Sequence, residues 1–198
     1  MNAEFILAQH DKAIQEARLN LTLSPIYLDT ETTGLGDNDQ IVEIGILGSD
    51  GSTLVSTLVN PTIAIPAAAT AVHGITEDMV KDAPTWAELW PQVSAIIGAN
   101  RVAIYNATYD LRMMYQSCWA HGLKPDRIES AFCVMKLYAA YHGQWNYRKS
   151  DFKWQSLTNA SQQMNITIEN THRAIDDCRL TRNILEAMAH GGNGHAAI

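Results

Sequence analysis

Two carboxylates, Asp29 and Glu31, stand two residues apart directly after the apolar run 25–28. Successive side chains of a β-strand point to opposite faces, so residues at this spacing on a strand project from the same face. Like charges held side by side repel each other, and a bound cation removes that repulsion. Carboxylate oxygens suit Mg²⁺ or Mn²⁺ better than Zn²⁺. The pair therefore predicts a divalent metal site at the end of a strand, where Gly34 is expected to turn the backbone tightly.

Two further clusters of candidate metal-binding or catalytic residues lie far along the chain. Asn106 and Asp110 follow an apolar run typical of a strand, and Asp110 falls in the first turn of a predicted helix. His172 and Asp177 stand at the entry to the last long helix. The positive end of a helix dipole stabilises a carboxylate in the first turn, so both aspartates are expected to be ionised and ready to bind metal. Asp176 is expected to face solvent or to cap the helix.

In order and separation, the three clusters resemble the three exonuclease motifs of the DnaQ-like 3′–5′ exonucleases. The motifs are Asp29-Thr30-Glu31-Thr32-Thr33-Gly34, Asn106-x₃-Asp110 and His172-x₄-Asp177. The histidine of the third motif is similar to that of the DEDDh branch. The resemblance runs from about residue 26 to about residue 189 and includes His73-Gly74-Ile75-Thr76. It implies an α/β fold of the RNase H-like type, with a mixed five-stranded sheet flanked by helices.

The resemblance also implies roles for the five motif residues in a two-metal hydrolysis of phosphodiester bonds, with Mg²⁺ or Mn²⁺. Asp29 would bridge both ions, and Glu31 and Asp177 would complete the site that activates water. Asp110 would support the second ion, partly through water. His172 would be the general base, since an imidazole that titrates near neutrality can accept the proton of that water. The product would be a nucleoside 5′-monophosphate released from a 3′ end.

A second set of residues is carried over from the family as the wall of a site for the terminal nucleotide. The set comprises Thr32, Thr33, Gly34, Leu35, His73, Ile75 and Asn106. Within it, Leu35 and Ile75 are expected to act as apolar wedges against bases. His73 and Asn106 are expected to reach the terminal sugar or phosphate.

The segment 145–154 interleaves aromatic and basic side chains, a composition typical of contacts with single-stranded bases and phosphates. The alternative is that Phe152 and Trp154 attach this loop to the core while the cations are solvated. We favour attachment for these two aromatic residues. A strand-contacting role for Arg148 or Lys149 stays open.

The elements that must position these residues follow from the hydrophobic pattern and the turn signals. Strands are expected at 25–30, 40–48, 53–59 and 101–105, a strand and then a helix within 128–141, and further helices near 67–72, 85–97, 107–121, 155–163 and 173–190. Residues 1–24 are expected to form an amphipathic helical extension, residues 25–190 the exonuclease domain and residues 191–198 a flexible tail. Glu43, on the second strand, matches no motif and is expected to have a structural or solvated role.

Apolar side chains recur at helical spacing near the N-terminus, with polar residues between them. They are Ala3, Leu7, Ile14, Ala17 and Leu21. This spacing predicts an amphipathic helix whose apolar face packs on the domain. Binding of a partner protein through this helix is the alternative.

The composition restricts the compartment and the partners. A chain of 198 residues fits one domain, and its net charge of −7 argues against a large basic surface for nucleic acid, although bound metal ions reverse the sign locally. Three separated cysteines without a C-x-x-C pair favour a reducing compartment. The sequence shows neither the basic start of a signal peptide nor the ~20-residue apolar run of a membrane span, so a cytoplasmic protein is expected.

These observations lead to a main hypothesis and two alternatives. The main hypothesis is a metal-dependent 3′–5′ exonuclease that acts on single-stranded ends of DNA, RNA or both. The first alternative is the proofreading subunit of a polymerase, docked through the N-terminal helix. The second is a binding platform for nucleic acid without catalytic activity. The choice between DNA and RNA and the formation of a homodimer stay open.

Overall fold

The computed structural model of the chain describes residues 2–167 and 173–191. The prediction for His172 lies outside the described residues, as do residues 192–198 of the expected tail. Within the described ranges, none of the helices is long and apolar enough to cross a membrane.

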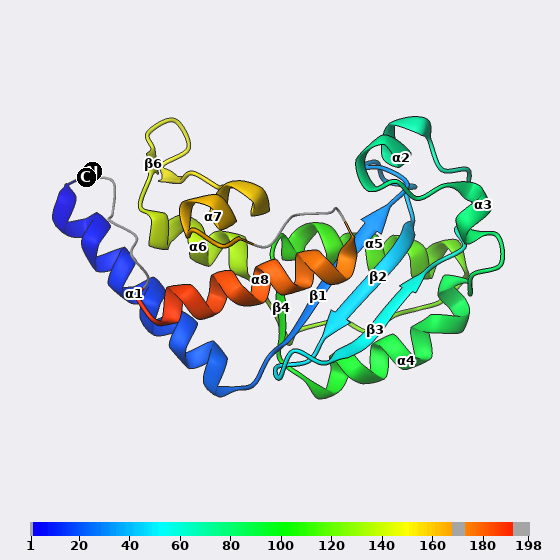
Figure 1. The fold of residues 1–198 in the computed structure, drawn as a ribbon, viewed down its shortest axis with the longest axis horizontal. Helices are drawn as coiled ribbons and strands as arrows, with labels where there is room; N and C mark the ends of the chain where they lie inside the picture. The colour runs from blue at the N-terminus through cyan, green and yellow to red at the C-terminus, as the bar shows by residue number, and fades with distance from the viewer. Residues whose placement is uncertain (1, 168–172, 192–198) are drawn as a thin grey trace.

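A mixed five-stranded sheet forms the centre of the molecule and confirms the predicted fold class (Figure 1). Its strands are β1 Ile26–Thr32, β2 Ile41–Leu47, β3 Thr53–Leu58, β4 Val102–Ile104 and β5 Ala131–Cys133. Their order is β3-β2-β1-β4-β5. The first three strands are antiparallel, whereas β4 runs parallel to β1 and to β5. β1, which carries the first motif, is therefore the central strand.

The sheet separates two layers of helices (Figure 1). The helices α4 Trp86–Ala99 and α5 Ala107–Ala120 lie on one side, and α1 Ala3–Thr22, α6 Val134–His142 and α8 Ala174–Ala189 lie on the other. Alternation along β1 divides the core accordingly. Ile26 and Leu28 pack with α4 and α5, whereas Tyr27 packs with α8. Asp29 and Glu31 continue the face of Tyr27, so they point to the α8 side.

A β-bulge interrupts the pairing of β1 with β2 at the first motif. Glu31 pairs with Glu43, but the next residue, Thr32, pairs with Ile41, so Val42 is the additional residue of β2. Val42 packs with Ile65, Ile75 and Val80 in a small separate cluster. This cluster attaches the helices α2 Ala67–His73 and α3 Glu77–Val80 to the end of the sheet that bears the motif.

The N-terminal helix α1 lies against α6 and α8 (Figure 1). Its buried residues are Ala13 and Ala17, whose small side chains let the helices approach closely. Ile14 and Leu21 are partly buried beside them. The expectation for Ala3 and Leu7 was wrong, because both side chains are exposed. The packed stripe thus runs through alanines in the second half of the helix.

The segment 145–154, which was expected to form a loop, contains a short hairpin of β6 Trp145–Asn146 and β7 Asp151–Phe152. Phe152 attaches it to α1, because its ring stacks on Phe5 at a centroid distance of 6.4 Å. The same role for Trp154 is wrong, since this side chain is 52% exposed. The helix α7 Leu157–Gln163 follows the hairpin.

Candidate active site

Three carboxylates from two elements converge at the end of the central strand. Asp29 and Glu31 come from β1, and Asp177 comes from the first turn of α8, which crosses the same face. Each of the three offers one carboxylate oxygen, and these oxygens all lie within 4.8 Å of one another. Asp29 and Glu31 share a face because side chains alternate along the strand. Asp177 reaches the same face because α8 crosses over β1.

Asp110 reaches the same end of the sheet from the first turn of α5. Its Oδ1 atom accepts hydrogen bonds from Thr30 N at 3.1 Å and from Thr30 Oγ1 at 2.8 Å. Thr30 stands between Asp29 and Glu31, but as the intervening strand residue it points to the opposite face. Asp110 is thereby fixed beside the three converging carboxylates without belonging to their 4.8 Å group.

Burial and nearby carboxylates raise the affinity of the four acids for protons. Burial, followed by the charges of Asp110 and Asp177, raises the pKa of Asp29 well above its usual range. Burial and the charges of Asp177 and Glu43 raise the pKa of Glu31 to about 8. Burial is also the main cause that raises the pKa of Asp110 to about 7 and the pKa of Asp177 to about 7. Without a cation, the cluster therefore retains protons near neutral pH.

The donor set fits a divalent cation. The three converging ligands are hard carboxylate oxygens, which Mg²⁺ and Mn²⁺ prefer. Among the described residues, none donates a hydrogen bond to the buried Oδ1 atom of Asp177. A buried oxygen without a donor is costly unless another ligand satisfies it. A bound cation would satisfy this atom and offset the charge repulsion that adds to burial in raising these pKa values.

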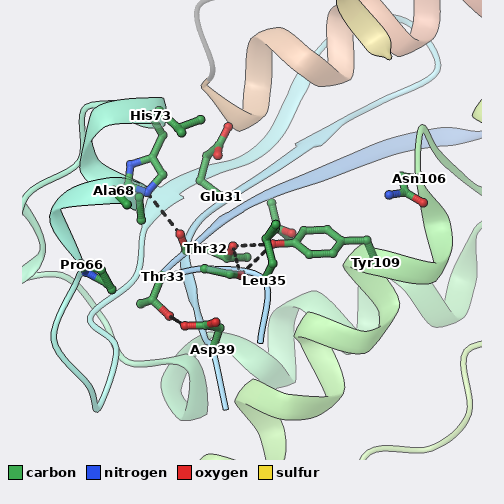
Figure 2. Close-up of a pocket in the computed structure, with 14 residues that line it drawn as sticks. Glu31, Thr32, Thr33, Leu35, Asp39, Pro66, Ala68, His73, Asn106 and Tyr109 are labelled. Atoms are coloured by element: carbon green, nitrogen blue, oxygen red, sulfur yellow. Dashed lines mark hydrogen bonds between the residues drawn. The ribbon is translucent and has the colours of Figure 1, made fainter. Parts of the chain in front are cut away.

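A cavity of about 750 Å³ adjoins the carboxylates, and Glu31 belongs to its wall (Figure 2). In Figure 2, His73 lies on one side of the cavity and Tyr109 on the other. His73 Nδ1 accepts a hydrogen bond from Ile75 N at 3.0 Å, so Nε2 carries the proton and donates to the carbonyl of Thr32 at 3.2 Å. Burial lowers the pKa of His73 and so disfavours the charged form of the ring. Both ring nitrogens are therefore engaged within the chain.

Comparison with known proteins gives the family. A family model described as Exonuclease, RNase_T, matches residues 26–185. The chain belongs to this exonuclease family. The match extends over the motifs of β1, α5 and α8 and leaves out the whole N-terminal helix.

Three similar proteins illustrate the range of the family. The chain is 43% identical over 184 residues to the "Uncharacterized exonuclease CP81" of Escherichia phage 186, over 90% of this chain and 94% of that protein. It is 29% identical over 176 residues to the DNA polymerase III subunit epsilon of Treponema pallidum, over 84% of this chain and 78% of that protein. Among solved structures, exonuclease X in complex with 5′ overhanging duplex DNA is similar with a TM-score of 0.63 and 27% identity, over 86% and 94% of the two chains.

Six of the seven residues that the sequence predicts around the terminal nucleotide line the cavity of this exonuclease. They are Thr32, Thr33, Gly34, Leu35, His73 and Asn106. Leu35 is 78% exposed and free to contact a ligand. The expectation for Ile75 was wrong: its side chain is 0% exposed and packs with Val42 and Val80. The β-bulge explains the difference, because it directs Val42 toward Ile75 and buries both.

Gly34 makes a close contact in the loop after β1 without a left-handed backbone. It is not among the described glycines with a positive φ. Instead, a Cβ atom at this position would stand 2.7 Å from Oδ2 of Asp39. Asp39 accepts hydrogen bonds from Thr33 Oγ1 at 2.6 Å and from Gly36 N at 2.6 Å. The carboxylate of Asp39 thus folds the loop after β1 tightly against the cavity wall.

Among the polar residues of the cavity wall, Tyr109 and Asp39 escaped the sequence analysis. The hydroxyl of Tyr109 lies 2.6 Å from Thr32 Oγ1 and donates to the carbonyl of Gly34 at 3.0 Å. Tyr109 directly precedes Asp110 in the first turn of α5. Its position next to this motif residue was a sequence signal that could have placed it near the site. Asp39 carries no comparable signal, because it lies in a loop between two strands.

Proposed function

We propose that this member of the exonuclease family depends on divalent metal ions and acts in the 3′–5′ direction. It releases nucleoside 5′-monophosphates from single-stranded ends of nucleic acid. The convergence of Asp29, Glu31 and Asp177 beside a nucleotide-sized cavity supports this proposal. The cavity and the carboxylates share Glu31, so a nucleotide held in the cavity would present its phosphate to the acidic cluster. The similarity to exonuclease X, whose structure contains duplex DNA, supports nucleic acid as the substrate.

Each acidic residue has a distinct part in the proposal. Asp29, Glu31 and Asp177 would hold the divalent ions, and Asp110, fixed by Thr30, would support them from α5. Two bound ions would stabilise the attacking and the leaving oxygen of an in-line displacement. His172, the expected general base, lies outside the described residues and enters the proposal on its motif alone.

The cavity wall would hold the terminal nucleotide in the proposal. Leu35 offers an exposed apolar surface for a base. The hydroxyls of Thr32 and Thr33 are bonded to Tyr109 and Asp39, and these hydrogen bonds stiffen the wall. A stiff wall favours one orientation of the nucleotide.

The two alternatives make different demands on the chain. A proofreading subunit is supported by the similarity to the epsilon subunit of Treponema pallidum, but α1, its expected docking helix, already packs on α6 and α8. A platform without activity would tolerate loss of acidic residues, whereas Asp29, Glu31, Asp110 and Asp177 are all in place. The exonuclease activity is therefore the conclusion that the site supports best.

The test is a time course on 5′-labelled single-stranded DNA and RNA with Mg²⁺, with Mn²⁺ and with EDTA. We expect a metal-dependent ladder that shortens from the 3′ end. Asp177→Asn should abolish it, whereas the matched control Asp176→Asn, which alters a carboxylate paired with Arg179 at 2.5 Å, should retain most of the rate. An intact substrate in every lane of the unaltered protein would contradict the proposal.

A further inference from the structure

The strand β2 presents its own residues beside the carboxylates of β1. Residues paired across antiparallel strands have their side chains on the same face. Glu43 is the partner of Glu31, and Gly45 is the partner of Asp29. The surface under the first turn of α8 is thus made by two acidic residues of β1 and by a glutamate and a glycine of β2.

Gly45 lets the helix rest directly on this surface. A Cβ atom at Gly45 would lie 2.7 Å from both Ala174 C and Ile175 N, which are backbone atoms that cannot rotate away. One turn further along α8, the thiol of Cys178 donates to the carbonyl of Gly45 at 3.3 Å. The position of the first turn, and with it that of Asp177, depends on this close approach.

Glu43 holds the beginning of the helix from the side. Arg173, at the N-cap of α8, makes no cap bond with its own side chain. Glu43 supplies the cap, because its Oε2 atom accepts a hydrogen bond from Ala174 N at 3.0 Å. The same carboxylate binds the guanidinium of Arg173, with Nη2 at 2.5 Å and Nε at 3.0 Å from Oε1. With 2% of its surface exposed, Glu43 is a buried charge with a built set of partners.

Arg173 also lies within electrostatic reach of the metal site. Its charge lowers the pKa of Glu31, the neighbour of Glu43 on the shared face. A guanidinium released by Glu43 has two further carboxylates within electrostatic reach, Asp176 and, in the metal site, Glu31. A cation bound there would compete with a divalent metal ion for the same oxygens.

We propose that Glu43 is a positioning residue for the metal site. It fastens the first turn of α8 to β2 so that Asp177 meets Asp29 and Glu31, and it keeps Arg173 away from the metal-binding oxygens. Its effect on catalysis rests on the proposed function, but its effects on metal binding and on the helix can be measured without any substrate.

The test uses the full chain and compares Glu43→Gln, Arg173→Met and the double variant. Calorimetric titration with Mn²⁺ measures metal affinity. Amide hydrogen exchange of the metal-free protein measures the local stability of the first turn of α8. Loss of a residue that orients metal ligands weakens metal affinity by about tenfold or more. We therefore expect Glu43→Gln to bind Mn²⁺ at least about tenfold more weakly than the unaltered chain. We also expect faster amide exchange at residues 174–178 in this variant. Arg173→Met should bind Mn²⁺ at least as tightly as the unaltered chain. The double variant should bind more tightly than Glu43→Gln, because the competing guanidinium is gone.

The control is Glu186→Gln, which removes the glutamate of another ion pair on α8, 3.0 Å from Arg182, without touching the first turn. It should leave both the affinity and the exchange unchanged. Unaltered Mn²⁺ affinity in Glu43→Gln would overturn the proposal, as would a double variant no better than Glu43→Gln. If Glu43→Gln does not fold, weakened binding by Arg173→Met alone would also overturn it. Failure of the unaltered chain to bind Mn²⁺ would instead reject the proposed function.

Discussion

The carboxylate of Asp110 is held by Thr30, whose backbone N–H and hydroxyl both donate to the same Oδ1 atom at 3.1 and 2.8 Å. One strand thereby supplies two acids to one face and orients a third acid from the other face. The two hydrogen bonds oppose the burial that raises the pKa of Asp110 to about 7. Thr30 thus affects the pH at which the fourth carboxylate becomes ionised.

Thr30→Val removes the hydroxyl donor and keeps the shape of the side chain. The pKa of Asp110 should rise further, because a hydrogen bond to the ionised form is lost. We expect the acidic limb of the pH–rate profile, measured at limiting Mg²⁺, to move up by about one pH unit. Thr22→Val, on the exposed end of α1, is the control and should leave the profile unchanged. An unmoved limb in Thr30→Val would show that Asp110 does not limit the rate.

The acidic cluster should make the stability of the metal-free protein depend on pH. The pKa values of Glu31, Asp110 and Asp177 are raised to between about 7 and about 8, above their unfolded values near 4. Between these limits the folded state binds more protons than the unfolded state, so the free energy of unfolding falls as the pH rises. In EDTA, the unfolding temperature should therefore be lower at about pH 8.5 than at about pH 6 through this contribution.

Mg²⁺ should reverse this trend, since it binds the ionised carboxylates. The increase in unfolding temperature caused by Mg²⁺ should be larger at the higher pH, and calorimetry near pH 7 should detect protons released on binding. Asp29→Asn with Asp177→Asn provides the comparison, because it removes two charges of the cluster and should flatten both effects. An equal response to Mg²⁺ in this variant would place metal binding elsewhere.

Leu35 and Ile75 were expected to have the same role and should now behave in opposite ways. Ile75→Ala removes a completely buried side chain and should lower the free energy of unfolding by about 2–5 kcal/mol. Leu35→Ala alters an exposed side chain and should change stability by less than about 0.5 kcal/mol while raising KM for the oligonucleotide. Chemical denaturation and initial rates separate the two effects. A stable Ile75→Ala variant with a raised KM would restore the wedge role.

The difference between these two residues shows what the sequence can and cannot predict. The shared direction of Asp29 and Glu31 could be predicted from the alternation of side chains along a strand. The positions of Asp110 and Asp177 could be predicted because each lies in the first turn of a predicted helix. The burial of Ile75 depends on the bulge at Val42, which leaves no local signal in the sequence. The partnership of Glu43 with Arg173 links residues 130 positions apart and depends on how α8 crosses the sheet. Contacts made by tertiary packing could therefore not be predicted from either segment alone.

Tyr109→Phe tests whether the stiffness of the cavity wall matters for the substrate. The variant keeps the ring and removes the hydroxyl that joins Thr32 Oγ1 and the carbonyl of Gly34. Loss of a buried hydrogen bond should lower the free energy of unfolding by about 1 kcal/mol. KM should rise a few-fold while metal affinity stays unchanged, because the carboxylates are not touched. Tyr115→Phe, which removes a hydroxyl bonded to Ile128 N at 2.8 Å outside the cavity, is the matched control and should leave KM unchanged.

The hairpin of β6 and β7 should contribute to the binding of long strands. The segment 145–154 has a net charge of +2 in a chain whose net charge is −7. Trp154 is half exposed, and Lys149 Nζ lies 5.9 Å from the centre of its ring, so an aromatic face and a cation stand together at the surface. This combination suits the bases and phosphates of a single strand. The sequence analysis did not expect Trp154 to be exposed. Its exposure supports a strand-contacting role for Arg148 and Lys149.

Arg148→Ser with Lys149→Ser should therefore raise KM for long single strands by about three- to tenfold and weaken its dependence on salt, since phosphate contacts release counterions. Cleavage of a dinucleotide, which is too short to reach beyond the cavity, should be unchanged. Lys124→Ser with Arg127→Ser is the control, because it removes a similar pair of cations from the loop beside α4 and β5. Equal effects of both double variants would mean that the overall charge of the chain, and not the hairpin, governs attraction of the strand.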